Sequence, residues 1–344
     1  MLSAHGGGLT TIGVSEFVSI ILFAARGAPR TMRMMKHDNS RTVGGAKIHR
    51  IPELAGKWFQ VAFSPDLPGI HSEPGEVVDH CFFKATNGRW QLWTQIRGTS
   101  VGRLFYRWEG STAIETPDWA ARGICWRAER RCGESWGTED KDFVHAPYVL
   151  QHDSRFILYY GGGPSATGHS QICAAASDDG IHFRRLTDNQ NQSQLFSGPG
   201  VARDPMVINT GKCYAMYYAA NVGESGVIAV RTASRPYGTP WSDYRIASEG
   251  GVCGDLRWTQ QCPFVVYLDG YYYLFKIGPS NGFRTAVYRS DDPLFFGAGD
   301  ERLVTVLETS VSEIIQEAGR FYISSLIPGY KGVSIRRLHW VPSD

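Results

Sequence analysis

Hydrophobic and polar positions recur along the chain in a fixed order: a short motif, an apolar run, a turn, and a strand rich in aromatic residues. Four copies are HAPYV at 145–149 followed by FILYYGG, RDPMV at 203–207 followed by CYAMYYAA, QCPFV at 261–265 followed by YYYLFKIG, and VSEII at 311–315 followed by RFYISSL. A weaker copy is VDHCF at 78–82 followed by RWQLWTQI. Aligned on the proline, the copies fall at positions 80, 147, 205, 263 and 312, with spacings of 67, 58, 58 and 49 residues. This regular spacing indicates an internal repeat.

Each copy has the pattern of two strands joined by a turn. Asn-Gly at 87–88 and Asp-Gly at 269–270 tolerate the positive φ that tight hairpins need, and a third strand-like segment follows most copies. No long stretch keeps a helical period. We therefore predict an all-β fold, a five-bladed β-propeller, in which the segment 57–63 (KWFQVAF) supplies the outer strand of the last blade and closes the ring. The alternative is a β-sandwich with coincidental spacing.

The repeat changes what the length implies. A chain of 344 residues suggests about two domains by length alone. Five blades of one ring instead account for residues 48–344 as a single propeller domain. We assign residues 1–47 to an N-terminal leader or disordered extension.

The N-terminal segment leaves the compartment open. Residues 14–25 (VSEFVSIILFAA) are mostly apolar and resemble the core of a secretory signal, but no Lys or Arg precedes them. They are too few to span a bilayer as a helix, so we expect no membrane partner. The protein is secreted if this segment acts as a signal, and cytoplasmic if translation starts near Met32–Met35.

Charge and cysteine content exclude several other classes. The net charge is +2, of which residues 1–47 carry +4 and the remainder −2, so the body lacks the basic bias of a nucleic-acid binder. The seven cysteines contain no CxxC pair, which gives a structural zinc site little support, and no convincing set of metal ligands is present. We expect no nucleic-acid partner, no metal and no cofactor.

The repeated motif lies where the first strand of each blade lines the central channel, so its polar residues should converge at one mouth. Strand alternation would place the residues just before and just after the aligned position on one face. Asp79 and Asp204 hold the position before it, and Tyr148 and Glu313 hold the position after it. Asp79, Asp204 and Glu313 should therefore point into the same cavity, with His145, Arg203 and Gln261 nearby.

Several carboxylates in one desolvated pocket have pKa values that are pushed apart, which is the arrangement that glycoside hydrolysis needs. Exposed Trp rings suit the C–H faces of sugars. The tryptophans considered for this contact are Trp90, Trp93, Trp136, Trp241 and Trp258. We name as candidate substrate-binding residues His145, Tyr148, Arg203, Trp93 and Trp258. The ordinary structural explanations stand beside these roles: a strand-start Asp often caps a turn, a lone His is usually a hydrogen-bonded structural group, and Trp residues in a propeller are more often wedges between blades.

Two of the motifs carry a resemblance to known families. Arg203-Asp204-Pro205 resembles the Arg-Asp-Pro motif of glycoside hydrolase family 32, the invertase, inulinase and levanase group. Gln261-Cys262-Pro263 stands where that family has Glu-Cys-Pro. The blade pattern, over about residues 57–342, is also similar to glycoside hydrolase family 43, the arabinanase and xylosidase group. Both families are five-bladed propellers with a three-carboxylate site and need no cofactor.

The resemblance implies roles for individual residues. Asp79 would be the nucleophile, or the base by analogy with family 43, and Asp204 would be the carboxylate that stabilises the reacting sugar. Gln261 would occupy the acid/base position. The sequence departs from family 32 at Val78-Asp79-His80-Cys81, where that family has Asn-Asp-Pro-Asn, and at Gln261, because an amide cannot donate a proton as a carboxylic acid does.

Three explanations of Gln261 remain open. The proton donor could be Glu313, His145 or Asp255 instead; the chain could bind a sugar without cutting it; or Gln261 could be an introduced replacement of a natural Glu. The leading hypothesis is a glycosidase acting on a furanosidic glycan, a fructoside or an arabinoside, with Asp79, Asp204, Gln261 and Glu313 as the catalytic set. The alternatives are a non-catalytic carbohydrate-binding propeller, and a propeller with other small-molecule chemistry at His145, Tyr148 and Glu313. The sugar, the linkage, the stereochemical outcome and the oligomeric state do not follow from the sequence.

Overall fold

The computed structural model describes residues 47–70, 75–135, 141–163, 170–278 and 283–343. The chain divides into two compact units, Met1–Asp38 and Asn39–Asp344, and all of the described residues belong to the second unit. The predicted leader, apart from Lys47, lies outside the described residues. Within those residues no helix is long and apolar enough to cross a membrane.

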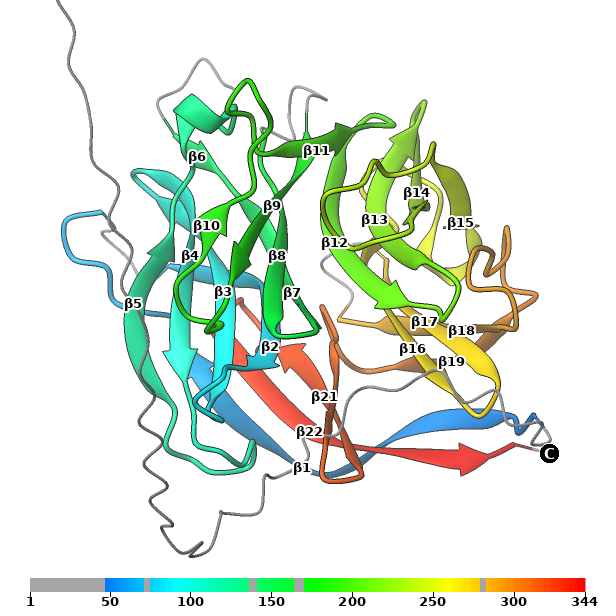
Figure 1. Cartoon of the computed structure of the whole chain (residues 1–344). Helices are drawn as coiled ribbons and strands as arrows, with labels where there is room; N and C mark the ends of the chain where they lie inside the picture. Colours follow the sequence, from blue (N-terminus) through cyan, green and yellow to red (C-terminus); the bar gives the residue numbers. More distant parts are fainter. Residues whose placement is uncertain (1–46, 71–74, 136–140, 164–169, 279–282, 344) are drawn as a thin grey trace, which may run out of the picture. The chain divides into compact units, whose positions relative to one another are not determined.

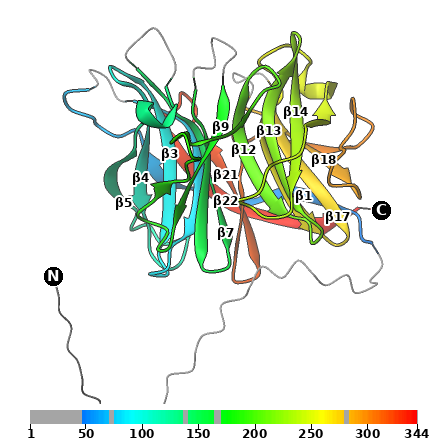
Figure 2. The same cartoon turned by 45° about the horizontal axis from the view of Figure 1, so that its top comes forward.

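The second unit is built of five antiparallel sheets arranged as the blades of a ring (Figures 1 and 2). Blade I contains β2 (Glu76–Lys84), β3 (Trp90–Thr99), β4 (Gly102–Glu109) and β5 (Ala120–Trp126), with β6 (Asp142–Phe143) parallel to β4. Blade II contains β7 (His145–His152), β8 (Arg155–Gly161), β9 (Gln171–Ser177) and β10 (Arg184–Arg185), with β11 (Gln194–Ser197) also paired to β9. Blade III contains β12 (Ala202–Asn209), β13 (Tyr214–Val222), β14 (Ser225–Ala233) and β15 (Arg245–Glu249). Blade IV contains β16 (Gln261–Leu268), β17 (Tyr271–Ile277), β18 (Thr285–Ser290) and β19 (Leu303–Leu307). The prediction of a five-bladed propeller is confirmed, and the β-sandwich alternative is wrong.

Blade V closes the ring with strands from both ends of the fold. It contains β20 (Ile314–Glu317), β21 (Arg320–Leu326), β22 (Gly332–Pro342) and, outermost, β1 (Arg50–Phe63). In Figure 1, β1 in blue runs beside β22 in red. The predicted closing segment 57–63 is thus part of the outer strand, which begins at Arg50, seven residues earlier than expected. This pairing gives β22 a partner along its outer edge, and an open edge would otherwise invite aggregation.

The aromatic second strands form the packing layers between blades. In β8, Tyr159 packs in the layer shared with blade III, while Tyr160, the next residue, packs in the layer shared with blade I. Both rings are fully buried, as are Tyr217 and Tyr218 in β13. Successive side chains of a strand point to opposite faces, so a strand with a neighbouring blade on each face is apolar throughout. This explains why these strands contain adjacent tyrosines instead of an alternating pattern.

A bulge interrupts four of the five innermost strands at the repeated motif. The ladder register shifts between Val77 and His80, His145 and Tyr148, Arg203 and Met206, and Gln261 and Phe264. The residue before the aligned position has a left-handed φ in four blades: Ala146 (39°), Asp204 (55°), Cys262 (50°) and Val311 (53°). Such bulges bend the strand and redirect the side chain that they carry. The side chains therefore converge because of a repeated bulge, and simple alternation is not the reason.

Candidate functional site

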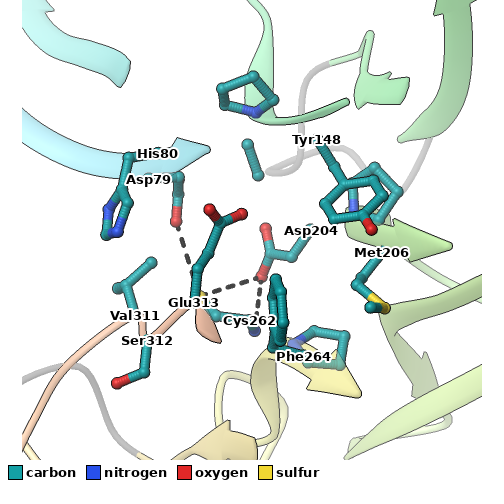
Figure 3. Close-up of a pocket in the computed structure, with 14 residues that line it drawn as sticks. Asp79, His80, Tyr148, Asp204, Met206, Cys262, Phe264, Val311, Ser312 and Glu313 are labelled. Carbon is teal, nitrogen blue, oxygen red and sulfur yellow. Dashed lines mark hydrogen bonds between the residues drawn. The ribbon is translucent and has the colours of Figure 1, made fainter. Parts of the chain in front are cut away.

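The repeated motif of all five blades lines one pocket at the centre of the ring (Figure 3). Its lining consists of the aligned positions and their immediate neighbours: Asp79, His80, Ala146, Pro147, Tyr148, Asp204, Pro205, Met206, Cys262, Pro263, Phe264, Val311, Ser312 and Glu313. The expectation that Asp79, Asp204 and Glu313 face a common cavity is confirmed as geometry. The cavity measures about 30 Å³, which is room for one or two water molecules but not for a sugar ring.

We call the residues that precede the aligned position the bulge layer, and Asp79, Asp204 and Cys262 are its polar members. The Cys262 thiol lies 3.6 Å from Oδ1 of Asp79 and 3.7 Å from Oδ2 of Asp204. Its single S–H proton can be donated to either carboxylate. The two carboxylate oxygens therefore lie no farther apart than the sum of 3.6 and 3.7 Å, about 7.3 Å, a limit within the range of separations found in glycosidases.

Asp79 titrates far above the ordinary range of an aspartate. Burial raises its pKa to about 7, and the negative charge of Asp204 adds to the rise. The positive charges of Arg203 and Arg103 and the Cys262 thiol oppose it. Burial also raises the pKa of Cys262 well above its usual value, so the thiol keeps its proton and acts as a donor. Near neutral pH, Asp79 is thus divided between its acid and its carboxylate forms.

Asp204 has neighbours that stabilise a charge. Oδ2 accepts a hydrogen bond from the backbone N–H of Cys262 at 3.2 Å, and Nε of Arg203 lies 3.9 Å from the same oxygen. The left-handed φ of Asp204 is one that aspartate tolerates better than most residues. The Arg-Asp-Pro sequence therefore places this carboxylate at the end of a bulge with a guanidinium and an amide facing it.

We call the residues that follow the aligned position the inner layer: Tyr148, Met206, Phe264 and Glu313. Glu313 receives one hydrogen bond, from the backbone N–H of Phe82 to Oε2 at 2.8 Å. Burial raises its pKa well above the usual value, which favours the protonated acid. Next to this layer, burial lowers the pKa of His80 to about 3, and its Nε2 pairs with Oγ of Ser324 at 2.7 Å.

Arginine side chains surround the start of the channel strands. Arg103 of β4 donates to Nδ1 of His145 at 2.7 Å, and burial lowers the pKa of His145 well below its usual value, so this histidine is neutral. The guanidinium of Arg203 lies 4.9 Å from the ring centre of Trp258, and that of Arg257 lies 5.2 Å from it. Trp258 as a residue is 42% exposed.

Gln261 does not line the pocket, although Cys262 beside it does. Its side-chain amide donates to the carbonyl oxygen of Trp258. The acid/base position of the resemblance is thus occupied by an amide that is held against the backbone of the neighbouring loop.

The structure contradicts a substrate-binding role for Trp93. This side chain is 1% exposed and packs between blades I and II against Phe83 and Phe183. The structural explanation, a wedge between blades, therefore applies. The sequence could not separate Trp93 from Trp258 because both are Trp residues near a motif, and only the position of Trp258 in a loop before β16 distinguishes them.

Other candidates from the sequence have structural partners. Trp90 is buried and its indole donates to Glu317 at 2.7 Å, and Trp241 packs against the core between blades II and III. Trp136 lies outside the described residues. The Tyr148 hydroxyl donates to the carbonyl of Val207 at 2.9 Å, which leaves the ring as its contribution to the pocket.

Two features of the site were missed from the sequence. Arg103 belongs to the third strand of its blade, where no motif marks it, although it affects Asp79 electrostatically. Cys262 was quoted only as part of a motif, yet it connects the two aspartates. Other chemistry at His145, Tyr148 and Glu313 would be favoured if Asp79 were held in a structural hydrogen bond away from the pocket, but Asp79 lines the pocket. Among the described residues, no three His, Cys, Asp or Glu side chains group as metal ligands do.

Comparisons with known proteins address the fold. No family model matches the chain, and no curated protein matches it by sequence. Solved structures do match. A family 43 β-xylosidase/α-arabinofuranosidase from a compost microbial metagenome, in complex with xylotriose, has a TM-score of 0.58 at 11% identity, over 86% of this chain and 96% of that one. A family 32 β-fructofuranosidase from Bombyx mori has a TM-score of 0.54 at 16% identity, over 80% of this chain and 64% of that one.

A third similar structure is a sucrose-6-phosphate hydrolase from Lactobacillus gasseri, with a TM-score of 0.56 at 14% identity, over 80% of this chain and 60% of that one. Identities this low establish the fold and leave the reaction to be tested. The chain therefore has the five-bladed propeller fold of the family 43 and family 32 glycoside hydrolases, and the predicted resemblance is confirmed at the level of the fold.

Proposed function

We propose that the protein is a glycoside hydrolase that acts on a furanosidic glycan, a fructoside or an arabinoside. The observation that carries this proposal is the pair Asp79 and Asp204, held at equivalent bulges of two channel strands and connected through Cys262. A glycosidase needs two carboxyl groups a few ångströms apart with unequal proton affinities. The raised pKa of Asp79 supplies this inequality.

In the proposed mechanism, the furanose ring lies at the mouth of the cavity, and Asp79 attacks its anomeric carbon as nucleophile or activates the attacking water as base. Its pKa of about 7 makes its carboxylate a stronger base than an ordinary aspartate, while a substantial fraction is still ionised at neutral pH. Asp204, held by a backbone N–H and close to the guanidinium of Arg203, accepts hydrogen bonds from sugar hydroxyls as positive charge develops on the ring.

The proton for the leaving group cannot come from Gln261, and the geometry favours Glu313 among the three substitutes. Glu313 lines the pocket, and burial raises its pKa well above the usual value, which favours the protonated form that a general acid needs. His145 is neutral and its Nδ1 already accepts from Arg103. Asp255 does not line the pocket.

Gln261 and the small cavity favour a second candidate, a propeller that binds a sugar without cutting it. A cavity of about 30 Å³ cannot enclose a furanose ring, so the ring would rest beside Trp258, above the bulge layer. Binding there would be saturable, and the glycan would keep its mass after long incubation. The variant Gln261→Glu would then test whether a carboxylic acid at this position is enough to turn sugar binding into sugar cleavage.

The experiment measures hydrolysis of sucrose, inulin, arabinan oligosaccharides and aryl furanosides by the wild type and by Asp79→Asn and Asp204→Asn. We expect each variant to lose about 10³-fold or more in kcat/KM, since each removes a group that acts in the transition state. The matched control is Asp118→Asn, the same chemical change at an exposed aspartate outside the pocket. Cleavage that persists in both pocket variants would contradict the proposal. Binding without cleavage by the wild type and by Gln261→Glu would support the second candidate.

A further inference from the structure

Three guanidinium groups gather around the start of the channel strands with few carboxylates to balance them. Among the described residues, Arg103 and Arg257 form no ion pair, and Arg203 has only the contact of 3.9 Å with Asp204. Asp79 is partly protonated near pH 7, and the position where the resemblance expects a glutamate is the neutral Gln261. Positive charge therefore exceeds negative charge around the sugar-facing side of the site.

Two of these guanidinium groups have an Nε–H without a hydrogen-bond acceptor. Nε of Arg203 and Nε of Arg257 are both buried, and neither has an acceptor within the part of the chain that the structure describes. The Arg203 side chain is only 13% exposed. Buried N–H groups are nearly always hydrogen-bonded, because an unmet donor loses its hydration without compensation. Both guanidinium groups therefore retain donor capacity that the described residues do not use.

Arg103 is in a similar position. Its one hydrogen bond among the described residues goes to a neutral imidazole, that of His145, and not to a carboxylate. Burial lowers its pKa, and the charges of Asp79 and Asp204 oppose this effect, while the nearby charge of Arg203 adds to it. A negative group placed between Arg103 and Arg203 would relieve both effects. Guanidinium groups bind carboxylates and phosphates with paired, parallel hydrogen bonds.

We propose that Arg103, Arg203 and Arg257, grouped around the site and the exposed ring of Trp258, bind an oxyanion carried by the glycan. The preferred ligand is thus a charged sugar, either a uronic acid or a sugar phosphate, which share an oxyanion on a ring that can stack on Trp258. This inference rests on the proposed function because it names the substrate class of the same site. The neutral furanosides expected from the family resemblance would be weaker ligands.

Isothermal titration calorimetry at pH 7 and low salt tests the proposal with matched pairs: galacturonate against galactose, and fructose 6-phosphate against fructose. We expect the charged member of at least one pair to bind about tenfold or more tightly, and the stronger pair identifies the source of the oxyanion. Raising the salt concentration should weaken the charged ligand alone. Equal affinities within both pairs would overturn the proposal, and so would inorganic phosphate binding as tightly as the sugar phosphate.

The variants Arg203→Gln and Arg103→Gln should lose about tenfold or more in affinity for the charged sugar and less than threefold for its neutral partner. Arg203→Lys keeps the charge without the planar fork, so an intermediate loss is expected, and it provides a second variant if Arg203→Gln does not fold. Arg320→Gln in blade V is the matched control and should bind as the wild type does. Uniform losses for charged and neutral sugars would overturn the proposal.

The binding measurement separates this inference from the proposed function. If the wild type cleaves no glycoside but prefers charged sugars, the hydrolase proposal fails and the oxyanion site stands. If it cleaves neutral furanosides and shows no preference for charge, the oxyanion site fails and the hydrolase proposal stands.

Discussion

The bulge layer and the inner layer of the pocket come from positions of the same repeated motif that are two residues apart, and the acids of the two layers have different surroundings. Asp79 and Asp204 of the bulge layer face arginines, a thiol and a backbone amide, and one of them titrates near neutral pH. Among the described residues, the Glu313 carboxyl of the inner layer accepts one hydrogen bond, from a backbone N–H, and burial raises its pKa well above the usual value. Charges and a thiol oppose the effect of burial at Asp79, whereas at Glu313 a backbone N–H opposes it, so the two layers differ in compensating charge.

The largest expected effect is on the rate of hydrolysis when the acid of the inner layer is replaced. The size of this effect should depend on the leaving group of the substrate. In Glu313→Gln the amide oxygen can still accept from the N–H of Phe82, but the proton is lost. If Glu313 is the general acid, hydrolysis of oligosaccharides should fall by about 10²–10⁴-fold. Aryl furanosides carry a leaving group that departs without a proton and should lose much less. Parallel kcat measurements on both substrates test this, and equal losses would remove Glu313 from the mechanism.

The difference in titration can be observed directly by carbon-13 NMR of the carboxyl groups. We expect one aspartate carboxyl to titrate near pH 7 and to disappear in Asp79→Asn. In Asp204→Asn the same titration should move to lower pH, since the neighbouring negative charge is removed. The Glu313 carboxyl should titrate well above the usual range of a glutamate. A titration of Asp79 near pH 4 in the wild type would contradict the raised pKa that we assign to this residue.

The smallest expected effect is on stability. The folded-state pKa of Asp79 is raised from 3.8 to about 7, so between these values the native state binds more protons than the unfolded state. Stability should therefore decrease as the pH rises from about 4 to 7, by at most about 1.4 kcal/mol per pH unit for one proton. Asp79→Asn should show a flatter dependence in urea unfolding at pH 5, 6 and 7. If the stability of the wild type and of Asp79→Asn changed with pH in parallel, the raised pKa of Asp79 would be contradicted. Asp118→Asn is the control.

The propeller itself was predictable from the sequence because each blade repeats one local pattern. The motif, turn and aromatic strand recur, and Tyr159 and Tyr160 already indicate a strand that is buried on both faces. The closing strand was also predictable, since an unpaired edge requires a partner and the segment 57–63 has the composition of one. Its start at Arg50 was missed because the mixed segment 50–56 is assigned to the strand by its pairing with β22, a contact between distant parts of the chain.

The candidate site was predictable in its members and not in their environments. Aligning the repeats placed Asp79, Asp204 and Glu313 around one cavity, since equivalent positions of a closed ring converge. The same alignment gave no information on Trp93, whose burial depends on the neighbouring blade, or on Arg103, which reaches the site from a third strand.

By itself the sequence determined the number of blades, the position of the repeated motif and the absence of a carboxyl group at Gln261, because these depend on residue identity and on local periodicity. Only the tertiary structure decided which acid keeps its proton, how Cys262 connects the two aspartates, and where unpaired arginines gather. Proton affinity and charge balance depend on desolvation and on neighbours from other blades. Those neighbours are brought together only when the ring closes.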